Sequence, residues 1–165
     1  MSCRLAIRRL DPATDRDSVS ALLAEAQDYY RLWLGHSPGA DETDAVFSSA
    51  PPGCDPDVSH RLGLYLGDSL SGVAEFSFGF PEPGDAYLGL MILAPRVRSR
   101  GHGAAFLAHL EGLAQQAKAS KIYLAVLEEN PRGAAFWVRM GFTPTGLSRH
   151  DATTGHTLHR LVKPL

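Results

Sequence analysis

Three arginines and two glycines lie together in the middle of the chain, in a pattern suited to binding phosphate. The arginines are Arg96, Arg98 and Arg100, and Gly101 and Gly103 follow them within three residues. An apolar helical pattern begins directly after the glycines, so the backbone N–H groups of its first turn lack partners within the helix. Those groups, the positive end of the helix dipole and the missing Cβ of glycine all favour an anion here. The sequence therefore predicts a phosphate-binding turn.

This turn must be positioned by the elements on either side of it. A strand is expected at residues 86–93, and apolar side chains at helical spacing run from Phe106 to Ala117. Residues 122–127 (IYLAVL) are apolar at nearly every position, as in a strand buried on both faces. A strand, a helix and a second strand in this order predict a right-handed crossover between parallel strands. The turn is therefore expected inside this unit, directly before its helix.

In the N-terminal half, the periodicity of apolar residues predicts further helices and strands. They are a strand at 5–8, a helix at 19–33, a short helix at 41–50 and an antiparallel hairpin of residues 61–66 and 72–80. Apolar and polar residues alternate along the second strand of the hairpin, which places Glu75 on its polar face.

The C-terminal part predicts one more helix and two more strands. Pro131 is well placed to begin the helix and Gly141 to end it. Residues 142–147 and 157–162 are expected to form antiparallel strands. A chain of 165 residues fits one domain, so we expect a single domain over residues 1–165.

Composition argues against several classes of function. The formal net charge of -2 gives no sustained basic face for general nucleic-acid binding. No stretch approaches the roughly 20 apolar residues that cross a bilayer, so we expect no membrane role and a cytoplasmic location. No metal is expected, because the following histidines show no metal-ligand spacing with carboxylates or cysteines: His36, His60, His150, His156 and His159.

A second motif, EENPRGAAFWVRMGF, lies at residues 128–142. Together with Arg98-x-x-Gly101-x-Gly103, it resembles a bacterial subgroup of the GNAT superfamily of N-acetyltransferases. In that family, R/Q-x-x-G-x-G/A is the pyrophosphate loop, and N-x-x-A-x-x-F-Y-x-x-x-G-F lies beside the pantetheine arm of acetyl-coenzyme A. The residues that match the second pattern in spacing are Asn130, Phe136, Gly141 and Phe142.

The resemblance covers nearly the whole chain and implies the α/β GNAT fold. That fold has a mixed central sheet of about six to seven strands flanked by about four helices. Its elements follow the order strand, two helices, three strands, helix, strand, helix, two strands. The implied function is transfer of acetyl from acetyl-CoA to a primary amine of a small molecule or peptide, by direct attack through a tetrahedral intermediate.

The resemblance also implies a binding site for acetyl-CoA as cosubstrate. Strand residues 91–93 and 123–125 are expected to splay apart, so that unpaired backbone groups hold pantetheine. The backbone N–H of Leu93 would stabilise the oxyanion. For His102 we keep two interpretations, a phosphate contact and a solvated variable position. The expected acetyl-CoA contacts are Met91, Ile92, Leu93, Arg98, Arg100, Gly101, His102, Gly103, Ala104, Asn130 and Phe136.

A base is needed because an alkyl ammonium has a pKa of about 10 and must lose a proton before it attacks. No carboxylate lies within residues 88–93, so the candidates are Glu75 and Asp85. We favour Glu75, with a structural carboxylate as the alternative.

The clearest departure from the family pattern is Trp137, which stands where a tyrosine often protonates the leaving thiolate. Indole cannot supply that proton. Trp137 is therefore expected either to line the acetyl pocket or to pack in the hydrophobic core. Tyr87 and Tyr123 are the candidate substitute acids.

The acceptor amine is expected near Tyr30, Trp33 and the turn at 148–156, but its identity and the length of the acyl group stay open. The family resemblance is compatible with a homodimer. One alternative is a non-catalytic acyl-CoA-binding sensor or interaction module of the same fold. A Rossmann dinucleotide site is the weaker rival, because Phe106 occupies the third glycine position and too little chain follows residue 127.

Overall fold

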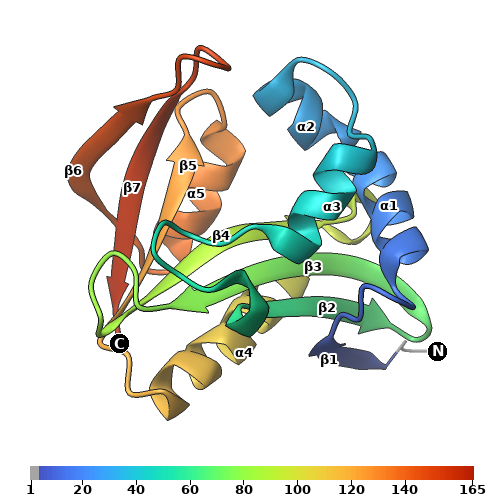
Figure 1. Cartoon of the computed structure of the whole chain (residues 1–165), viewed down its shortest axis with the longest axis horizontal. Helices are drawn as coiled ribbons and strands as arrows, with labels where there is room; N and C mark the ends of the chain where they lie inside the picture. Colours follow the sequence, from blue (N-terminus) through green and yellow to red (C-terminus); the bar gives the residue numbers. More distant parts are fainter. Residues whose placement is uncertain (1–3) are drawn as a thin grey trace.

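The chain folds around one mixed sheet of seven strands, in a computed structural model that describes residues 4–165 (Figure 1). The strands are β1 (Leu5–Arg9), β2 (His60–Leu66), β3 (Ser69–Phe78), β4 (Asp85–Leu93), β5 (Lys121–Leu127), β6 (Thr143–His150) and β7 (Thr157–Pro164). Their order across the sheet is β1-β2-β3-β4-β5-β7-β6. Among these described strands only β4 and β5 are parallel, because the helix α4 (His102–Gln116) connects them. The predicted crossover and order of elements are confirmed.

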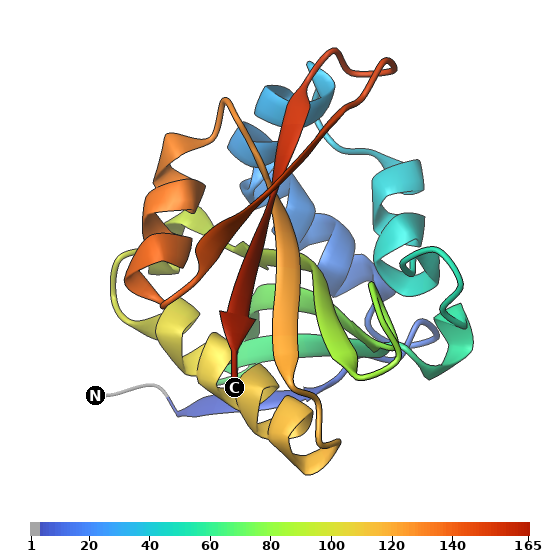
Figure 2. The same cartoon turned by 90° about the vertical axis from the view of Figure 1, so that its left-hand side faces the viewer.

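Helices cover both faces of the sheet (Figures 1 and 2). One face carries α1 (Arg16–Glu25), α2 (Gln27–Leu34) and α3 (Ala40–Ser48), and the other carries α4 and α5 (Pro131–Arg139). Two short 3₁₀ helices, η1 (Pro56–Val58) and η2 (Pro95–Val97), lie in the connections.

The continuous helix expected at 19–33 is two helices that meet at Ala26. Ala26 has φ −89° and ψ 27°, outside helical geometry, and its N–H still bonds to the Leu22 carbonyl at 3.0 Å. Its side chain is fully buried, so the bend is fixed by packing rather than by a Gly or Pro. After the bend, α2 continues beyond the end of α1 in a different direction (Figure 1).

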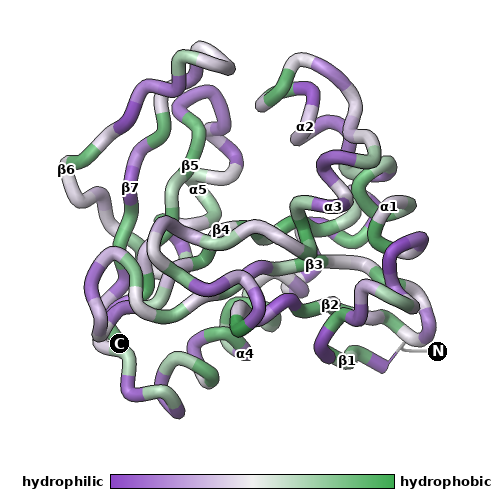
Figure 3. The backbone as a smooth tube through the Cα atoms, viewed as in Figure 1, coloured by the Kyte–Doolittle hydropathy of each residue, from purple (hydrophilic) through white to green (hydrophobic). Residues whose placement is uncertain are grey.

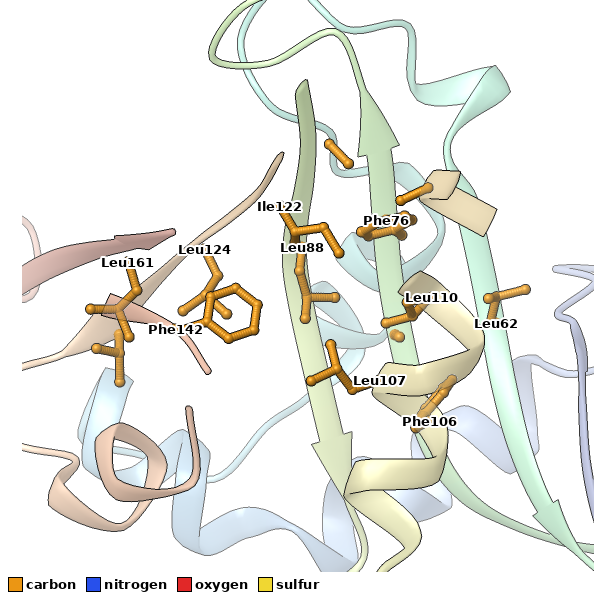
Figure 4. Close-up of a cluster of buried hydrophobic side chains, with 14 of the residues drawn as sticks. Leu62, Phe76, Leu88, Phe106, Leu107, Leu110, Ile122, Leu124, Phe142 and Leu161 are labelled. Carbon is orange, nitrogen blue, oxygen red and sulfur yellow. The ribbon is translucent and has the colours of Figure 1, made fainter. Parts of the chain in front are cut away.

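Two clusters of buried apolar side chains hold these layers together. The larger lies under α4, and the members labelled in Figure 4 are Leu62, Phe76, Leu88, Phe106, Leu107, Leu110, Ile122, Leu124, Phe142 and Leu161. The second, under α1–α3, includes Val19, Leu22, Leu23, Tyr30, Val46, Val73 and Ile92. Figure 3 shows the hydrophobic stretches along β2, β5 and α1. Burial of each large side chain contributes roughly 1.5–3 kcal/mol, so these contacts fix the strands that support the site.

The parallel pair β4–β5 is joined over only three residue pairs. The register pairs residues 85–87 with 121–123 and then stops. Beyond that point β4 still pairs with β3 as far as Leu93, and β5 pairs with β7 along its whole length. The two strands therefore splay apart, as expected for 91–93. Tyr123 is a correction to the expected range, because it still pairs with Tyr87.

A bulge in β4 lies at this point of divergence. Glu75 faces Leu90 and Phe76 faces Leu88, so Gly89 is the extra residue between them. A Cβ on Gly89 would lie 2.1 Å from Glu75 Oε2. Glycine is therefore required for the carboxylate to occupy its place.

Candidate functional site

The start of α4 has the geometry of an anion site. Gly101 precedes the helix with φ 85°, in the left-handed region that favours glycine, and the first intrahelical bond is from Ala105 N to Gly101 O at 3.1 Å. No side chain of the described residues caps this end. The N–H groups of residues 102–104 are therefore without a hydrogen-bond acceptor among residues 4–165.

Gly103 brings α5 close to this turn. A Cβ at Gly103 would lie 3.0 Å from the ring of Phe136 and 3.5 Å from Leu93 Cδ1. Phe136 is half-buried and stacks edge-on against Trp137 at 4.9 Å, and Trp137 contacts Phe142 at 5.4 Å. Trp137 thus packs against the margin of the α4 core, in agreement with one of its two expected roles.

The arginines of the turn differ in their contacts. Arg98 makes a two-pronged ion pair with Asp28 of α2, at 2.6 and 3.2 Å, and its Nε donates to the Leu93 carbonyl at 3.1 Å. Hydrogen bonding from Arg98 holds the pKa of Asp28 below its usual value. Arg96 pairs with Glu25. Arg100 is exposed and makes no ion pair or side-chain hydrogen bond within residues 4–165.

Alternate N–H groups of β4 face the gap beside β5. Ala94 N donates to Ser71 O at 2.9 Å, so Ala94 and Ser71 form a hydrogen-bonded pair that continues the β3–β4 ladder. Bonded and non-bonded pairs alternate in an antiparallel ladder. The N–H groups of Leu93 and Met91 therefore point away from β3, into the gap, whereas that of Ile92 points toward β3.

The face of the sheet under α2 and α3 contains a cavity of about 330 Å³. Its lining comes from both helices and from the bulge of the β3–β4 pair: Tyr30, Trp33, Leu34, Asp41, Glu42, Ala45, Val46, Ser49, Glu75, Gly89 and Leu90. The expected acceptor residues Tyr30 and Trp33 are brought together here. The turn at 148–156 does not contribute to the lining.

Glu75 forms the floor of this cavity and is only 4% exposed. Its Oε1 accepts hydrogen bonds from the hydroxyls of Ser59 and Ser77, which are 2.8 Å from each other. Its Oε2 lies at Gly89 and has no hydrogen-bond donor within residues 4–165. One oxygen is thus held in place while the other faces the cavity.

Of the nearby charged residues, Arg61 affects the electrostatics of the floor, whereas Asp85 lies at the other end of β4. Arg61 lies opposite Glu75 on β2 and donates to the carbonyls of Val46 and Pro56 at 2.8 and 3.0 Å. Burial lowers the pKa of Arg61, and the charge of Glu75 acts against that shift. Asp85, the other candidate base, accepts from Glu82 N at 3.3 Å and lies outside the lining.

Tyr87 lies beside this floor on β4. Its ring is 5.0 Å from that of Phe80, and the guanidinium of Arg160 lies 5.4 Å over Phe80. Burial raises the pKa of Tyr87, so its phenol is protonated at neutral pH. Tyr123 pairs with Tyr87 across the short parallel seam. Both candidate acids therefore lie at the point where the strands diverge.

Two expected acetyl-CoA contacts have local roles. Asn130 caps α5, because its Oδ1 accepts from Gly133 N at 3.0 Å. His102 opens α4 and makes no side-chain hydrogen bond within residues 4–165.

The cavity-lining residues that the sequence did not indicate as part of the site belong to α3 and to the bulge in β4. Asp41 and Glu42 look like ordinary charges of a surface helix. Gly89 did carry a signal, since a glycine inside an apolar strand marks a bulge or a close approach. The structure describes no group of three His, Cys, Asp or Glu side chains able to hold a metal. It also describes no helix that is both long and apolar enough to cross a bilayer.

Comparisons with known proteins agree with this architecture. The sequence profile of the Acetyltransferase (GNAT) family matches residues 20–142. An acetyltransferase from Thermus thermophilus is similar with a TM-score of 0.78 at 23% identity, over 100% of both chains. The ribosomal-protein-S18-alanine N-acetyltransferase from Escherichia coli has a TM-score of 0.70 at 16% identity, over 98% of this chain and 94% of that one.

Nourseothricin acetyltransferase has a TM-score of 0.69 at 21% identity, over 97% of this chain and 98% of that one. No curated protein sequence matches the chain. At these identities the solved structures show a common fold.

Proposed function

Because the chain belongs to the GNAT acetyltransferase family, we propose that it transfers acetyl from acetyl-CoA to a primary amine. One observation carries this proposal. The gap between β4 and β5 opens beside the uncapped start of α4, and the bulge at the same gap places Glu75 on the floor of a cavity. A donor groove and an acceptor cavity thus meet at one point of β4.

The residues of the groove fit acetyl-CoA. The amides of residues 102–104 and the Arg100 guanidinium would hold the pyrophosphate. The N–H groups of Met91 and Leu93 would hold the pantetheine arm, with Phe136 beside it. When bound, acetyl-CoA supplies an acetyl thioester. Leu93 N–H is our predicted oxyanion donor, and Met91 N–H has the same direction and lies nearer the cavity floor.

Glu75 supplies the base in this proposal. Its Oε2 accepts a proton from the substrate ammonium, so that the neutral amine attacks the thioester carbon. A C–N bond forms, the C–S bond breaks and the sulfur leaves with the electron pair. The nitrogen then loses its extra proton to the thiolate or to solvent, which leaves the neutral amide and CoA. Ser59 and Ser77 hold the other oxygen of Glu75 so that Oε2 stays over Gly89.

The leaving thiolate does not need the missing tyrosine. A thiol pKa of about 8.5 makes the thiolate a tolerable leaving group. Tyr87 lies opposite Ser77, which donates to Glu75, so it is the better placed of the two candidate acids. Trp137 stands against the core and would form one wall of the acetyl site.

Two relatives illustrate the choice of acceptor. One acts on the alanine of ribosomal protein S18 and the other on nourseothricin, by their names. A cavity of about 330 Å³ lies at the small end of the roughly 300–1,000 Å³ range of small-molecule sites. We therefore favour a small amine over a peptide N-terminus.

The test is thiol release from acetyl-CoA across a panel of primary amines, with the acetylated product identified by mass spectrometry. Glu75→Gln should lower kcat/KM by roughly 10²–10⁴-fold, because removal of a general base has that effect. Glu82→Gln, an acid outside the cavity, is the matched control and should behave as wild type. An unchanged pH profile in Glu75→Gln would remove this residue as the base.

The absence of tyrosine at position 137 also favours a second candidate function. A GNAT-fold module could bind acyl-CoA as a sensor without turnover. Acetyl-CoA would then raise the melting temperature, and no amine in the panel would release thiol.

A further inference from the structure

The acceptor cavity is acidic on two sides. Glu75 lies on its floor, Asp41 and Glu42 lie on its α3 wall, and no lysine or arginine of the described chain contributes to the lining. Asp41 is exposed at the start of α3. Arg61 lies behind the floor and is occupied by two backbone carbonyls. A positively charged occupant is the one that these three carboxylates would stabilise.

Glu42 is held in position at the cavity wall. Its Oε2 accepts from Gly39 N at 2.7 Å, which fixes the side chain to the first turn of α3. The pKa of Tyr30 is raised, first by burial, then by Tyr29 and by Glu42. The negative charge of Glu42 therefore acts on the hydroxyl of Tyr30, which lines the same cavity.

The remaining lining is apolar and aromatic. The rings of Tyr30 and Trp33 lie 6.0 Å apart, tilted by 37°, and Leu34, Val46 and Leu90 complete the wall. Aromatic faces attract organic cations and pack against hydrocarbon. The occupant thus needs an apolar body as well as positive charge.

The floor carries a carboxylate oxygen that is open to the cavity and free to accept a hydrogen bond from a ligand. Glu75 is more than nine-tenths buried, and its Oε2 faces the cavity without a donor within residues 4–165. A ligand that fills the cavity would remove water from this oxygen, which makes a hydrogen-bond donor on that ligand favourable. An ammonium group on the ligand would satisfy it.

We propose that the acceptor is an organic diamine: one amine lies at Glu75 and is acetylated, and a second cation lies between Asp41 and Glu42. The apolar body between the two nitrogens packs against Trp33 and Leu90. This inference rests on the proposed function, because it assigns the substrate class of the same cavity. It adds what the family assignment does not supply, a requirement for a second positive charge.

The experiment compares diamines with monoamines of the same skeleton. Pentane-1,5-diamine is paired with pentylamine, and 1,4-bis(aminomethyl)benzene with benzylamine. A symmetrical diamine gains a factor of about two from its two equivalent amines. We expect kcat/KM to favour the diamine by at least about tenfold, and the preference to shrink as salt is added.

A variant without the two α3 carboxylates tests whether they cause the preference for diamines. Asp41→Asn with Glu42→Gln removes both charges, and glutamine keeps an oxygen for the Gly39 N–H. The diamine-to-monoamine ratio should fall to about two. Asp44→Asn is the control, because Asp44 lies on the same helix, pairs with Arg16 and is not in the lining. Its ratio should stay at the wild-type value.

The outcomes separate this inference from the proposed function. Turnover of monoamines and diamines at equal rates would overturn the inference and leave the acetyltransferase assignment intact. A ratio that survives in the double variant would also overturn it. If no amine is turned over, the proposed function fails. Calorimetry in the presence of CoA then decides the inference, since equal affinities for diamine and monoamine would contradict it.

Discussion

The position of the Glu75 carboxylate depends on the glycine at position 89. The carboxylate needs space above β4, and the bulge provides it only because Gly89 has no Cβ. The serines at 59 and 77 fix one carboxylate oxygen and leave the second toward the cavity. The orientation of this proposed base is therefore set by its neighbours as well as by Glu75 itself.

Gly89→Ala tests this pairing. The new Cβ would lie 2.1 Å from Oε2, and the carboxylate must swing away because it is the end of a flexible side chain. We expect kcat/KM to fall by at least about tenfold, with a stability loss of about 1 kcal/mol. Steady-state kinetics and thermal unfolding measure the two effects.

Gly112→Ala is the control for that experiment. Gly112 lies in α4, and a Cβ added there would meet no atom of the described chain within 4 Å beyond its own helix backbone. Alanine is a better helix former there, so stability should rise by about 0.5–1 kcal/mol with activity unchanged. Full activity in Gly89→Ala would show that the carboxylate position is not needed.

At the scale of elements, the Asp28–Arg98 ion pair joins the two halves of the site. Asp28 belongs to α2, which carries Tyr30 and Trp33, whereas Arg98 also bonds to the Leu93 carbonyl at the end of β4. Arg98 thereby connects α2, at the proposed acceptor cavity, to the end of β4, at the proposed acetyl-CoA site. The partners are 70 residues apart in sequence, so no local pattern could indicate the pair.

The two arginines should consequently behave differently on substitution. Arg100→Gln removes an exposed guanidinium beside the helix start, and we expect CoA affinity to fall by roughly fivefold or more. Arg98→Gln should lower the melting temperature and change CoA affinity less. Calorimetry with CoA distinguishes them. A greater loss of affinity in Arg98→Gln would support the phosphate contact first predicted for it.

A second element junction depends on pH. Asp15, before α1, accepts two bonds at 3.0 Å from Arg8 of β1 and one at 2.7 Å from Asp11 N. Hydrogen bonding from Arg8 and from the Asp11 amide lowers the pKa of Asp15. The stabilisation is therefore present above the ordinary carboxyl pKa of about 4 and is lost as pH falls through the lowered value.

Asp15→Asn should cost about 1–3 kcal/mol at pH 7, because it weakens a buried, charge-assisted network. The difference in melting temperature between wild type and variant should stay constant from pH 7 to about 5 and shrink as pH is lowered below about 4. Thermal unfolding at several pH values measures it. A difference that stays constant below about pH 4 would mean that the charge of Asp15 does not stabilise the junction.

Across the whole molecule, the sheet consists of two parts joined by a three-residue parallel seam. Residues 85–87 and 121–123 form the seam. Beyond it, the backbone groups of β4 and β5 no longer form hydrogen bonds with each other. The N–H groups of Met91 and Leu93 face this gap. They should exchange with deuterium faster than Ile92, and bound CoA should protect them. Amide exchange measured by NMR, with and without CoA, tests this, and equal rates at all three residues would contradict it.

Much of this architecture could be predicted from sequence, because its elements have strong periodicity. The apolar run at 122–127 and the glycines at 101 and 103 indicated the crossover and its turn. The bend at Ala26 could not be predicted, since alanine is an excellent helix former and only packing breaks the helix there.

The candidate site was predictable only where it depends on local backbone. Amides at a helix start follow from sequence, as does the polar face that carries Glu75. The hydroxyl of Ser59 and the bulge at Gly89 contact Glu75 only through tertiary packing, and packing also brings the acids of α3 to the same cavity. Those contacts decide which oxygen faces the cavity, and periodicity carries no information about them.

The chain contains two tryptophans, and each lies at a different one of the two proposed binding sites. Trp33 lines the cavity proposed for the amine, whereas Trp137 packs edge-on against Phe136 beside the site proposed for acetyl-CoA. Their indole emission can thus be assigned by single replacements. Trp33→Phe leaves a fluorophore beside acetyl-CoA, and Trp137→Phe leaves one beside the amine. The order in which the two substrates bind can then be followed by stopped-flow fluorescence without any added label.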